Sequence, residues 1–309
     1  REPAAAWRDA WVVLQCSAVA GSSRGFPVGA LRVSRAIRSG SQGEARVGVV
    51  FHDADAYSGG GLIDRLRRKF QFYAMRRLFR EAGKVILTVP AGRIAWLPAE
   101  HTKAAFIPVG ANLPPVEFHA IPPAQRPRTP VVAVFGVTGG TGIPRETREI
   151  ARTVNHAAAK AGRIRLLVLG RNALEARGSF EQTLDSSCVD LETHGVLPAA
   201  EVAHLLAKAD VLLFVRGHIS PRRTSAIAGI ACGLPVVAYS GVETDAPITE
   251  AGVVLAPEGD GVSLGEQLAR VLCHADFRCE LSMRSRAALQ KFFSWDAIAA
   301  RYAAVLRED

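Results

Sequence analysis

One pattern constrains this chain of 309 residues more than any other: short apolar runs of strand length alternate with stretches of helical periodicity. Such alternation predicts parallel βα units and an α/β fold. The pattern stops once, between Leu113 and Pro130, where six prolines interrupt a stretch without periodicity. A proline-rich stretch of this kind predicts a linker. We therefore predict two Rossmann-like parallel-sheet domains facing a cleft, residues 1–120 and residues 121–309.

The expected elements follow from the periodicity on each side of the linker. Before it, we predict strands Trp11–Gln15, Val47–His52, Val85–Val89 and Ala105–Pro108, and helices Val28–Arg38 and Leu62–Glu81. After it, we predict strands Val131–Gly136, Ile164–Gly170, Val211–Val215, Pro235–Ala238 and Val253–Leu255, and helices Arg145–Ala161, Ala199–Ala207, Thr224–Cys232, Val262–His274, Phe277–Phe292 and Trp295–Leu306. In helix Leu62–Glu81 the expected apolar stripe is Ile63, Leu66, Phe70, Ala74 and Leu78.

Several function classes are limited by composition. No apolar run reaches the ~20 residues of a membrane-spanning helix. The chain opens on Arg1 rather than Met, and we interpret this as a truncated start with an incomplete first domain. The five scattered cysteines favour buried thiols in a reducing compartment, and no His or Cys residues show metal-ligand spacing, so we predict no metal site.

The net charge of +9 is compatible with nucleic acid, anionic lipid or a phosphorylated substrate. Nucleic acid is disfavoured because no binding module is present and the aromatic residues are not interleaved with the basic ones. Helix Leu62–Glu81 concentrates the basic residues Arg65, Arg67, Arg68, Lys69, Arg76, Arg77 and Arg80. It predicts either a solvated face or peripheral contact with an anionic membrane.

The sharpest candidate site follows the strand that ends at Val215. Its loop contains His218, Arg222 and Arg223, and a helix then begins near Thr224 or Ser225, either of which could be the N-cap. Helix N-termini bind phosphate through unpaired N–H groups and the helix dipole, and arginines add charge-assisted hydrogen bonds. The pattern predicts a diphosphate site, with a solvated arginine loop as the alternative.

Three further features lie at predicted strand ends. A glycine loop containing Gly139 and Gly140 lacks the dinucleotide spacing, so it predicts backbone approach to a sugar diphosphate or simply a flexible turn. Arg171 adds a cation at the same edge of the second sheet. His52, followed by Asp53, ends a strand of the first domain and is either a catalytic or acceptor-positioning group or a structural histidine.

Five stretches, in this order and spacing, resemble those of a family-four glycosyltransferase of the GT-B fold. They are Val49–Asp53, Phe106–Asn112, Ala209–Leu213, Gly229–Ala238 and Phe293–Ala299. The resemblance implies that the second domain binds a nucleotide sugar, that the first binds the acceptor, and that the final helix, residues 295–307, returns to the first domain. It also implies that no metal or other cofactor is needed, and it matches His52 to the histidine that faces the reacting sugar.

The sequence departs from that family at two places. Two glutamates spaced eight positions apart are replaced by Ser220 and Ala228, and the lysine after the glycine loop is missing, with Gly140 and Thr141 nearby. Either Arg222, Arg223 and Ser225 define a divergent subgroup, or donor binding is weakened or lost.

The resulting expectation is a glycosyltransferase that moves a sugar from a nucleoside-diphosphate sugar to a glycan or lipid-linked acceptor in envelope polysaccharide assembly. The reducing compartment indicated by the cysteines predicts a cytoplasmic location, and the basic helix Leu62–Glu81 leaves open a peripheral position at the inner face of the membrane. Retention of anomeric configuration follows from the resemblance alone. A degenerate GT-B binding or scaffold protein and a GT-B nucleotide-sugar epimerase are the alternatives.

Overall fold

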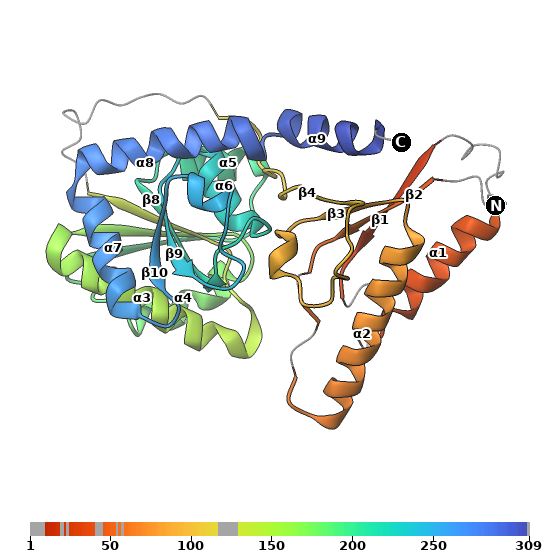
Figure 1. Cartoon of the computed structure of the whole chain (residues 1–309). Coiled ribbons are helices and arrows are strands. Elements are labelled where there is room, and N and C mark those ends of the chain that lie inside the picture. Colours follow the sequence, from red (N-terminus) through yellow and green to blue (C-terminus); the bar gives the residue numbers. More distant parts are fainter. Residues whose placement is uncertain are drawn as a thin grey trace. The chain divides into compact units, whose positions relative to one another are not determined.

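Two parallel β-sheets organise the chain in the computed structural model, which describes residues 10–18, 22, 25–40, 46–53, 55–56, 59–116 and 129–307. Unit 1 comprises residues 1–108 and 298–309, and unit 2 comprises residues 109–297. Each unit contains one of the sheets (Figure 1). Residues 117–128 of the predicted linker lie outside the described residues.

Unit 1 is built on a four-stranded sheet in the order β1-β2-β3-β4, with every neighbouring pair parallel. Its elements are β1 (Trp11–Cys16), α1 (Val28–Gly40), β2 (Arg46–Phe51), α2 (Leu62–Glu81), β3 (Lys84–Leu87), a 3-10 turn (Ala91–Arg93) and β4 (Ala104–Phe106), and α9 (Trp295–Arg307) joins it from Ile298 onward.

Both faces of the unit 1 sheet are covered, and the alternation of side chains along β2 shows how. Val49 and Phe51 point into a core cluster that includes residues of α1 and α2. Val50 points the other way and packs with Ile86 and with Ile298 of α9. Successive strand residues face opposite sides of a sheet, so α1 and α2 cover one face and α9 the other.

The prediction for the apolar stripe of α2 is wrong at its first turns. Ile63 and Leu66 are 67% and 61% exposed, and the buried residues of α2 are Gln71, Ala74, Met75, Leu78 and Phe79. The helix of 20 residues is about 30 Å long, whereas β2 with six residues spans only about 20 Å. The first turns of α2 therefore have no sheet to pack against.

Unit 2 is built on a six-stranded parallel sheet in the order β10-β9-β8-β5-β6-β7. Its elements are β5 (Val131–Phe135), a 3-10 turn (Gly140–Gly142), α3 (Ile143–Ala161), β6 (Ile164–Leu169), α4 (Ala173–Glu181), β7 (Val189–His194), α5 (Ala199–Ala207), β8 (Val211–His218), α6 (Thr224–Ala231), β9 (Val236–Ser240), a 3-10 turn (Ile248–Glu250), β10 (Val253–Pro257), α7 (Gly261–Cys273), α8 (Ala275–Ala288) and a π-helical turn (Leu289–Phe293).

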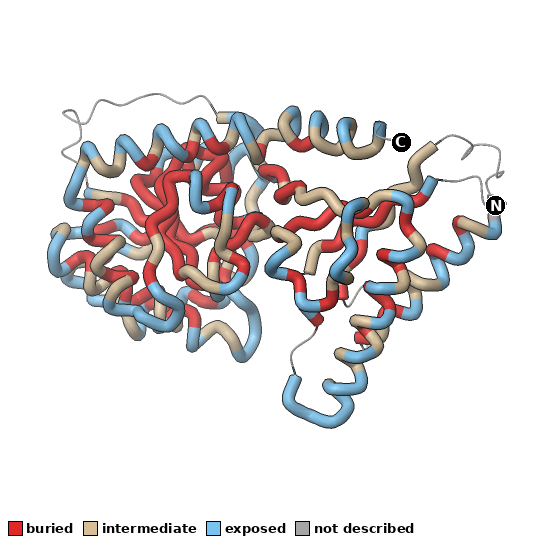
Figure 2. Tube along the Cα trace, in the orientation of Figure 1, coloured by how far each residue is buried: buried red, intermediate tan, exposed pale blue. Residues whose placement is uncertain are grey.

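Helices sandwich this sheet, and its strands are the most deeply buried part of the unit (Figure 2). Val132 and Val134 of β5 face the core cluster formed with α3, α4 and α7. The intervening Ala133 faces a second cluster formed with α5, α6 and the end of α8. Strands buried on both faces are apolar at nearly every position, which explains why most of these strands are visible in the sequence.

Unit 2 departs from the predictions in two places. We did not predict α4 or β7, because β7 is an edge strand whose polar residues Asp190, Glu192 and His194 leave no apolar run. Strand β8 ends at His218 rather than at Val215: its register against β9 shifts between Phe214 and His218, and Gly217 has a φ of 68°. That left-handed conformation favours glycine. Among the described residues, every helix is too short or too polar to span a lipid bilayer.

Candidate functional site

The strand order of unit 2 selects one edge of its sheet. Strands β5 and β8 are neighbours, but the helices that follow them, α3 and α6, pack on opposite faces. Where consecutive connections diverge in this way, a crevice opens at the carboxyl ends of the two strands, and ligands of open α/β sheets bind there. The predicted glycine loop follows β5, and the arginine loop follows β8.

The glycine loop after β5 is held by side chains from two other segments. Asn172 Nδ2 donates to the Val137 carbonyl oxygen at 2.7 Å, and Glu146 Oε2 accepts from the Thr138 amide at 3.0 Å. A Cβ on Gly139 would lie 2.9 Å from Asn172 Nδ2, whereas one on Gly140 would meet no atom within 4 Å. The loop thus packs closely at Gly139 and borders open space at Gly140.

Arg216 lies between the glycine loop and α6, and it is half-buried in unit 2. Its Nη2 donates to the Phe135 carbonyl oxygen at 3.0 Å and to Ser225 Oγ at 2.6 Å. Burial lowers the pKa of Arg216, and the negative charge of Glu146 opposes that shift. These four residues and Gly136 are among those that line a cavity of about 10 Å³, the space of one water molecule. A half-buried cation therefore connects the end of β5 to the first turn of α6.

The first turn of α6 differs from the prediction. The helix begins at Thr224, the N-cap position is Arg223, and no side chain caps it, so Thr224 and Ser225 are not the N-cap. The reason is that Ser225 already lies inside the helix, where its hydroxyl accepts from Arg216. Thr224 is exposed while the rest of α6 is buried. The first amides of a helix have no intrahelical acceptor, so this tip presents N–H donors.

Arg222 is bound by a carboxylate that sequence reasoning missed. Its Nε and Nη2 donate to Glu243 Oε2 and Oε1 at 2.7 and 2.8 Å. His218 lies between two acids, with Nε2 3.9 Å from Glu243 Oε2 and Nδ1 3.7 Å from Glu258 Oε2. Burial acts to raise the pKa of Glu243, but Arg222, His218 and Arg223 lower it below its ordinary value. Glu243 is therefore ionised at neutral pH.

The remaining predicted residues are distributed over both units. Arg171 is exposed and follows β6, where its carbonyl oxygen accepts from the Val137 amide at 3.1 Å. Eight of the predicted site residues thus follow or end strands of one sheet at its carboxyl edge: Gly139, Gly140, Arg171, His218, Arg222, Arg223, Thr224 and Ser225. His52 belongs to unit 1.

His52 is half-buried at the carboxyl end of β2. Its Nε2 lies 2.7 Å from Gln15 Oε1 of the neighbouring strand β1. The adjacent carboxylate of Asp53 accepts from the Ala18 amide at 2.6 Å. One polar group beside the His52 ring is thus the side-chain amide of Gln15, a residue that the sequence motifs do not mark.

Four residues of the site were not predicted from the sequence: Glu243, Glu258, Glu146 and Arg216. Glu243 and Glu258 follow β9 and β10, so the rule that strand ends meet at one edge could have found them. Glu146 carried no such signal, because it lies inside α3 and is 7% exposed. The described ranges contain no group of three or more His, Cys, Asp or Glu side chains arranged to hold a metal ion, and independence from metal stays a prediction.

Solved structures share this architecture. Sucrose-phosphate synthase from Thermosynechococcus elongatus superposes with a TM-score of 0.67 at 22% identity, over 96% of this chain and 73% of that one. HepE from Anabaena, solved with UDP and glucose, gives 0.62 at 15% identity over 95% and 77%. The lipopolysaccharide outer core galactosyltransferase WaaB gives 0.59 at 12% identity over 95% and 74%.

The chain has the GT-B glycosyltransferase fold. The predicted fold class, two parallel-sheet domains of the GT-B type, is confirmed. No protein-family model matches the sequence, and no curated protein matches it. The resemblance to family four among GT-B proteins accordingly rests on the sequence motifs alone.

Proposed function

We propose that this GT-B chain transfers a sugar from a nucleoside-diphosphate sugar to a glycan or lipid-linked acceptor in cell-envelope polysaccharide assembly. The observation that carries the proposal is the exposed, uncapped tip of α6 at the switch point of the unit 2 sheet, beside Arg222 and Arg223. Unpaired helix amides and arginines are the groups that hold diphosphates. The structural neighbours support it, since HepE was solved with UDP-glucose and WaaB is a galactosyltransferase.

In the proposed reaction, the α6 tip stabilises charge rather than forming covalent bonds. The bond between the sugar and the nucleoside diphosphate breaks, and negative charge develops on the departing diphosphate. Donors fixed in advance at that position lower the barrier most effectively. The amides of Thr224 and Ser225, with Arg171, Arg222 and Arg223, would supply them. We propose that Gly139 and Gly140 let the loop backbone approach the diphosphate and that His218 borders the donor. The proposal has two further parts. His52 orients the acceptor or the sugar hydroxyls, and the transfer retains the anomeric configuration of the sugar.

A binding or scaffold protein without turnover is the second candidate. It is favoured by Ser220 and Ala228, which occupy the positions of the family glutamates and are fully buried without a carboxylate. Isothermal titration with UDP, GDP and ADP, followed by assays of the corresponding sugars, separates the candidates. Acceptor-dependent release of the nucleotide indicates a transferase, interconversion of the sugars indicates an epimerase, and binding without turnover indicates a scaffold.

The decisive variant is Arg222→Ala with Arg223→Ala. Loss of at least two charge-assisted hydrogen bonds, worth about 1.5–3 kcal/mol each, should weaken nucleotide binding at least about 100-fold. Arg163→Ala with Arg165→Ala is the matched control, because Arg163 also makes a bidentate pair, with Asp190, but at the amino edge of the same sheet. Unchanged affinity in the first variant, or equal losses in both, would contradict the proposed site.

We also propose that unit 1 makes peripheral contact with an anionic membrane through α2. Residues at alternating spacings of four and three along this helix are all exposed and form an outward stripe: Leu62, Leu66, Lys69, Tyr73, Arg76 and Arg80. The stripe is apolar at its start and cationic toward its end. Apolar side chains beside arginines and lysines are the combination that binds anionic bilayer surfaces.

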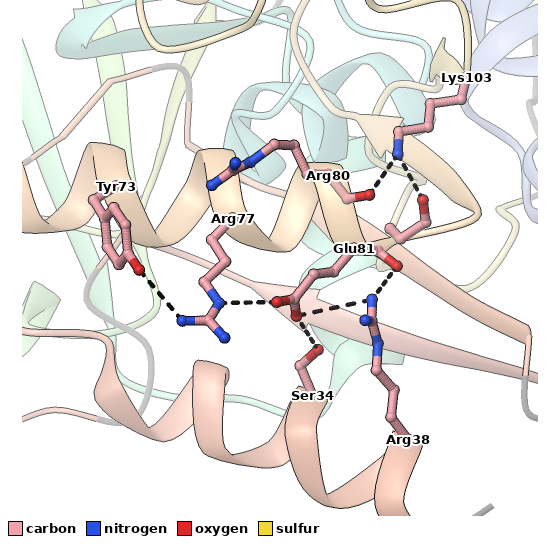
Figure 3. A network of polar contacts seen from close by, with 8 residues as sticks. Ser34, Arg38, Tyr73, Arg77, Arg80, Glu81 and Lys103 are labelled. Atoms are coloured by element: carbon pink, nitrogen blue, oxygen red, sulfur yellow. Dashed lines mark hydrogen bonds and ion pairs between the residues drawn. The ribbon is translucent and has the colours of Figure 1, made fainter. Parts of the chain in front are cut away.

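The end of the outward stripe borders a cationic hollow. Glu81 accepts from Arg77 Nε at 2.8 Å and from Ser34 Oγ at 3.2 Å, and Arg38 lies 3.8 Å from the same carboxylate (Figure 3). The hollow of about 470 Å³ is lined by Arg38, Tyr73, Arg77, Arg80 and Glu81. Three arginines against one glutamate leave a net positive charge, which suits a lipid phosphate. The cytoplasmic location stays a prediction.

A further inference from the structure

Glu243 forms a close ion pair with Arg222 at the carboxyl edge of the unit 2 sheet. It stands three residues beyond the end of β9 and is 6% exposed. Both of its carboxylate oxygens accept from Arg222, at 2.7 and 2.8 Å. Bidentate arginine–carboxylate pairs fix the guanidinium in a single orientation, so Glu243 determines where Arg222 points.

The turn that carries Glu243 is itself anchored to the loop before α6. Thr244 Oγ1 donates to the Ile219 carbonyl oxygen at 2.6 Å and accepts from the Gly241 amide at 2.9 Å. The Thr244 amide donates to the Gly241 carbonyl oxygen at 3.0 Å. Glu243 is therefore held against Arg222 by backbone and side-chain bonds on both sides of it.

A buried carboxylate beside an anion site has an electrostatic cost. Its charge repels a diphosphate at the α6 tip, and this repulsion is strong where water is excluded. The order that the carboxylate imposes on Arg222 acts in the opposite direction, because immobilising a flexible side chain in advance removes an entropic cost from binding. The two effects have opposite signs, so their balance can be measured.

We infer that Glu243 is a positioning residue for the nucleotide: it holds Arg222 at the tip of α6, and this ordering outweighs its repulsion of the diphosphate. The inference rests on the proposed function and deepens it. It assigns to the turn after β9 a carboxylate that acts on the donor site through Arg222, although Ser220 and Ala228 leave the positions of the family glutamates without one.

The test is isothermal titration with UDP, GDP and ADP. We expect Glu243→Ala to weaken nucleotide binding about 3- to 10-fold, which corresponds to the entropic cost of immobilising one side chain on binding. This loss is expected even though the substitution removes a negative charge. Glu243→Gln, which keeps the size and one acceptor oxygen, should give an intermediate affinity. Asp190→Ala is the matched control, because Asp190 also binds an arginine, Arg163, through both carboxylate oxygens but lies at the amino edge of the same sheet, and its removal should leave affinity unchanged.

Comparison in an Arg222→Ala background separates positioning from folding. There, adding Glu243→Ala should not weaken nucleotide binding further and should tighten it, because the residue that it orients is gone and only its repulsion of the diphosphate remains. An equal loss in both backgrounds, or tighter binding by Glu243→Ala or Glu243→Gln than by the unaltered chain, would overturn the inference alone. Absence of nucleotide binding by the unaltered chain would overturn the proposed function and the inference with it.

Discussion

The five thiols fall into different environments. Cys16 and Cys232 are 3% and 4% exposed, and burial raises the pKa of each to about 12, with Asp53 adding to the shift at Cys16. Cys273 and Cys279 are exposed. The expectation of buried thiols is therefore wrong for these two, because both lie on outward positions of α7 and α8 that the apolar pattern does not mark.

We predict that a maleimide at pH 8 labels Cys273 and Cys279 rapidly in the folded chain. Only the thiolate reacts, and at pH 8 a thiol with a pKa of about 12 is almost entirely protonated, so Cys16 and Cys232 should resist labelling. Both should react once guanidinium unfolds the chain. Peptide mass spectrometry measures the four sites, and rapid native labelling of Cys16 or Cys232 would contradict the burial described here.

Individual site residues differ in how visible they are in the sequence. Arg222, Arg223 and Thr224 were predicted because they belong to one short segment between a strand and a helix, so their proximity is local. Glu243 could not be paired with Arg222 in advance, because 21 positions separate them and only the adjacency of β8 and β9 brings them together. Arg216 lies on a strand, because the strand predicted to end at Val215 continues to His218.

Helix α6 packs against β8 at a distance that only glycine permits. A Cβ on Gly229 would lie 2.7 Å from Leu212 Cδ2 and 3.0 Å from Leu212 Cβ. The second distance involves an atom next to the backbone, which cannot move aside as a side-chain end can. In contrast, Gly178 of α4 is exposed, and a Cβ there would meet nothing within 4 Å.

Two glycine-to-alanine variants should therefore have opposite effects on the free energy of unfolding. We predict that Gly229→Ala destabilises unit 2 by about 1–3 kcal/mol through overpacking. Gly178→Ala should stabilise it by about 0.5–1 kcal/mol, because alanine is the better helix former and loses less entropy. Urea denaturation of both variants measures the difference, and a neutral Gly229→Ala would mean that α6 and β8 are less closely packed.

The surface of unit 1 concentrates cations and exposed apolar side chains on the same pair of helices. Val33 of α1 and Leu62, Ile63 and Leu66 of α2 are all exposed, and the outward stripe of α2 continues into the cationic hollow at Glu81. Such a surface should bind vesicles containing phosphatidylglycerol and release them as salt is raised, since surface charges are screened over about 10 Å at 0.1 M salt.

We predict that Lys69→Glu with Arg80→Glu reduces co-sedimentation with anionic vesicles at least about tenfold, at roughly 1 kcal/mol for each lost charge and more for its reversal. Arg148→Glu with Arg152→Glu makes the same charge change on exposed positions of α3 in unit 2 and should retain binding. Binding to neutral vesicles should be weak for every variant. Equal losses in the two charge-reversal variants would indicate attraction by net charge and contradict a surface on α2.

Local pattern was sufficient for the α/β class, for most strands and helices and for the composition of the loop before α6, because these depend on neighbours within a few positions of the chain. Strand order was not available from local pattern: β8 pairs with β5, from which it is separated by two βα units, and that pairing places the switch point beside the glycine loop. The exposure of Leu66 and the pair of Arg222 with Glu243 likewise depend on which segments meet in space. Hydrophobic periodicity shows that a face is apolar, but whether another element covers that face is decided by packing between distant parts of the chain.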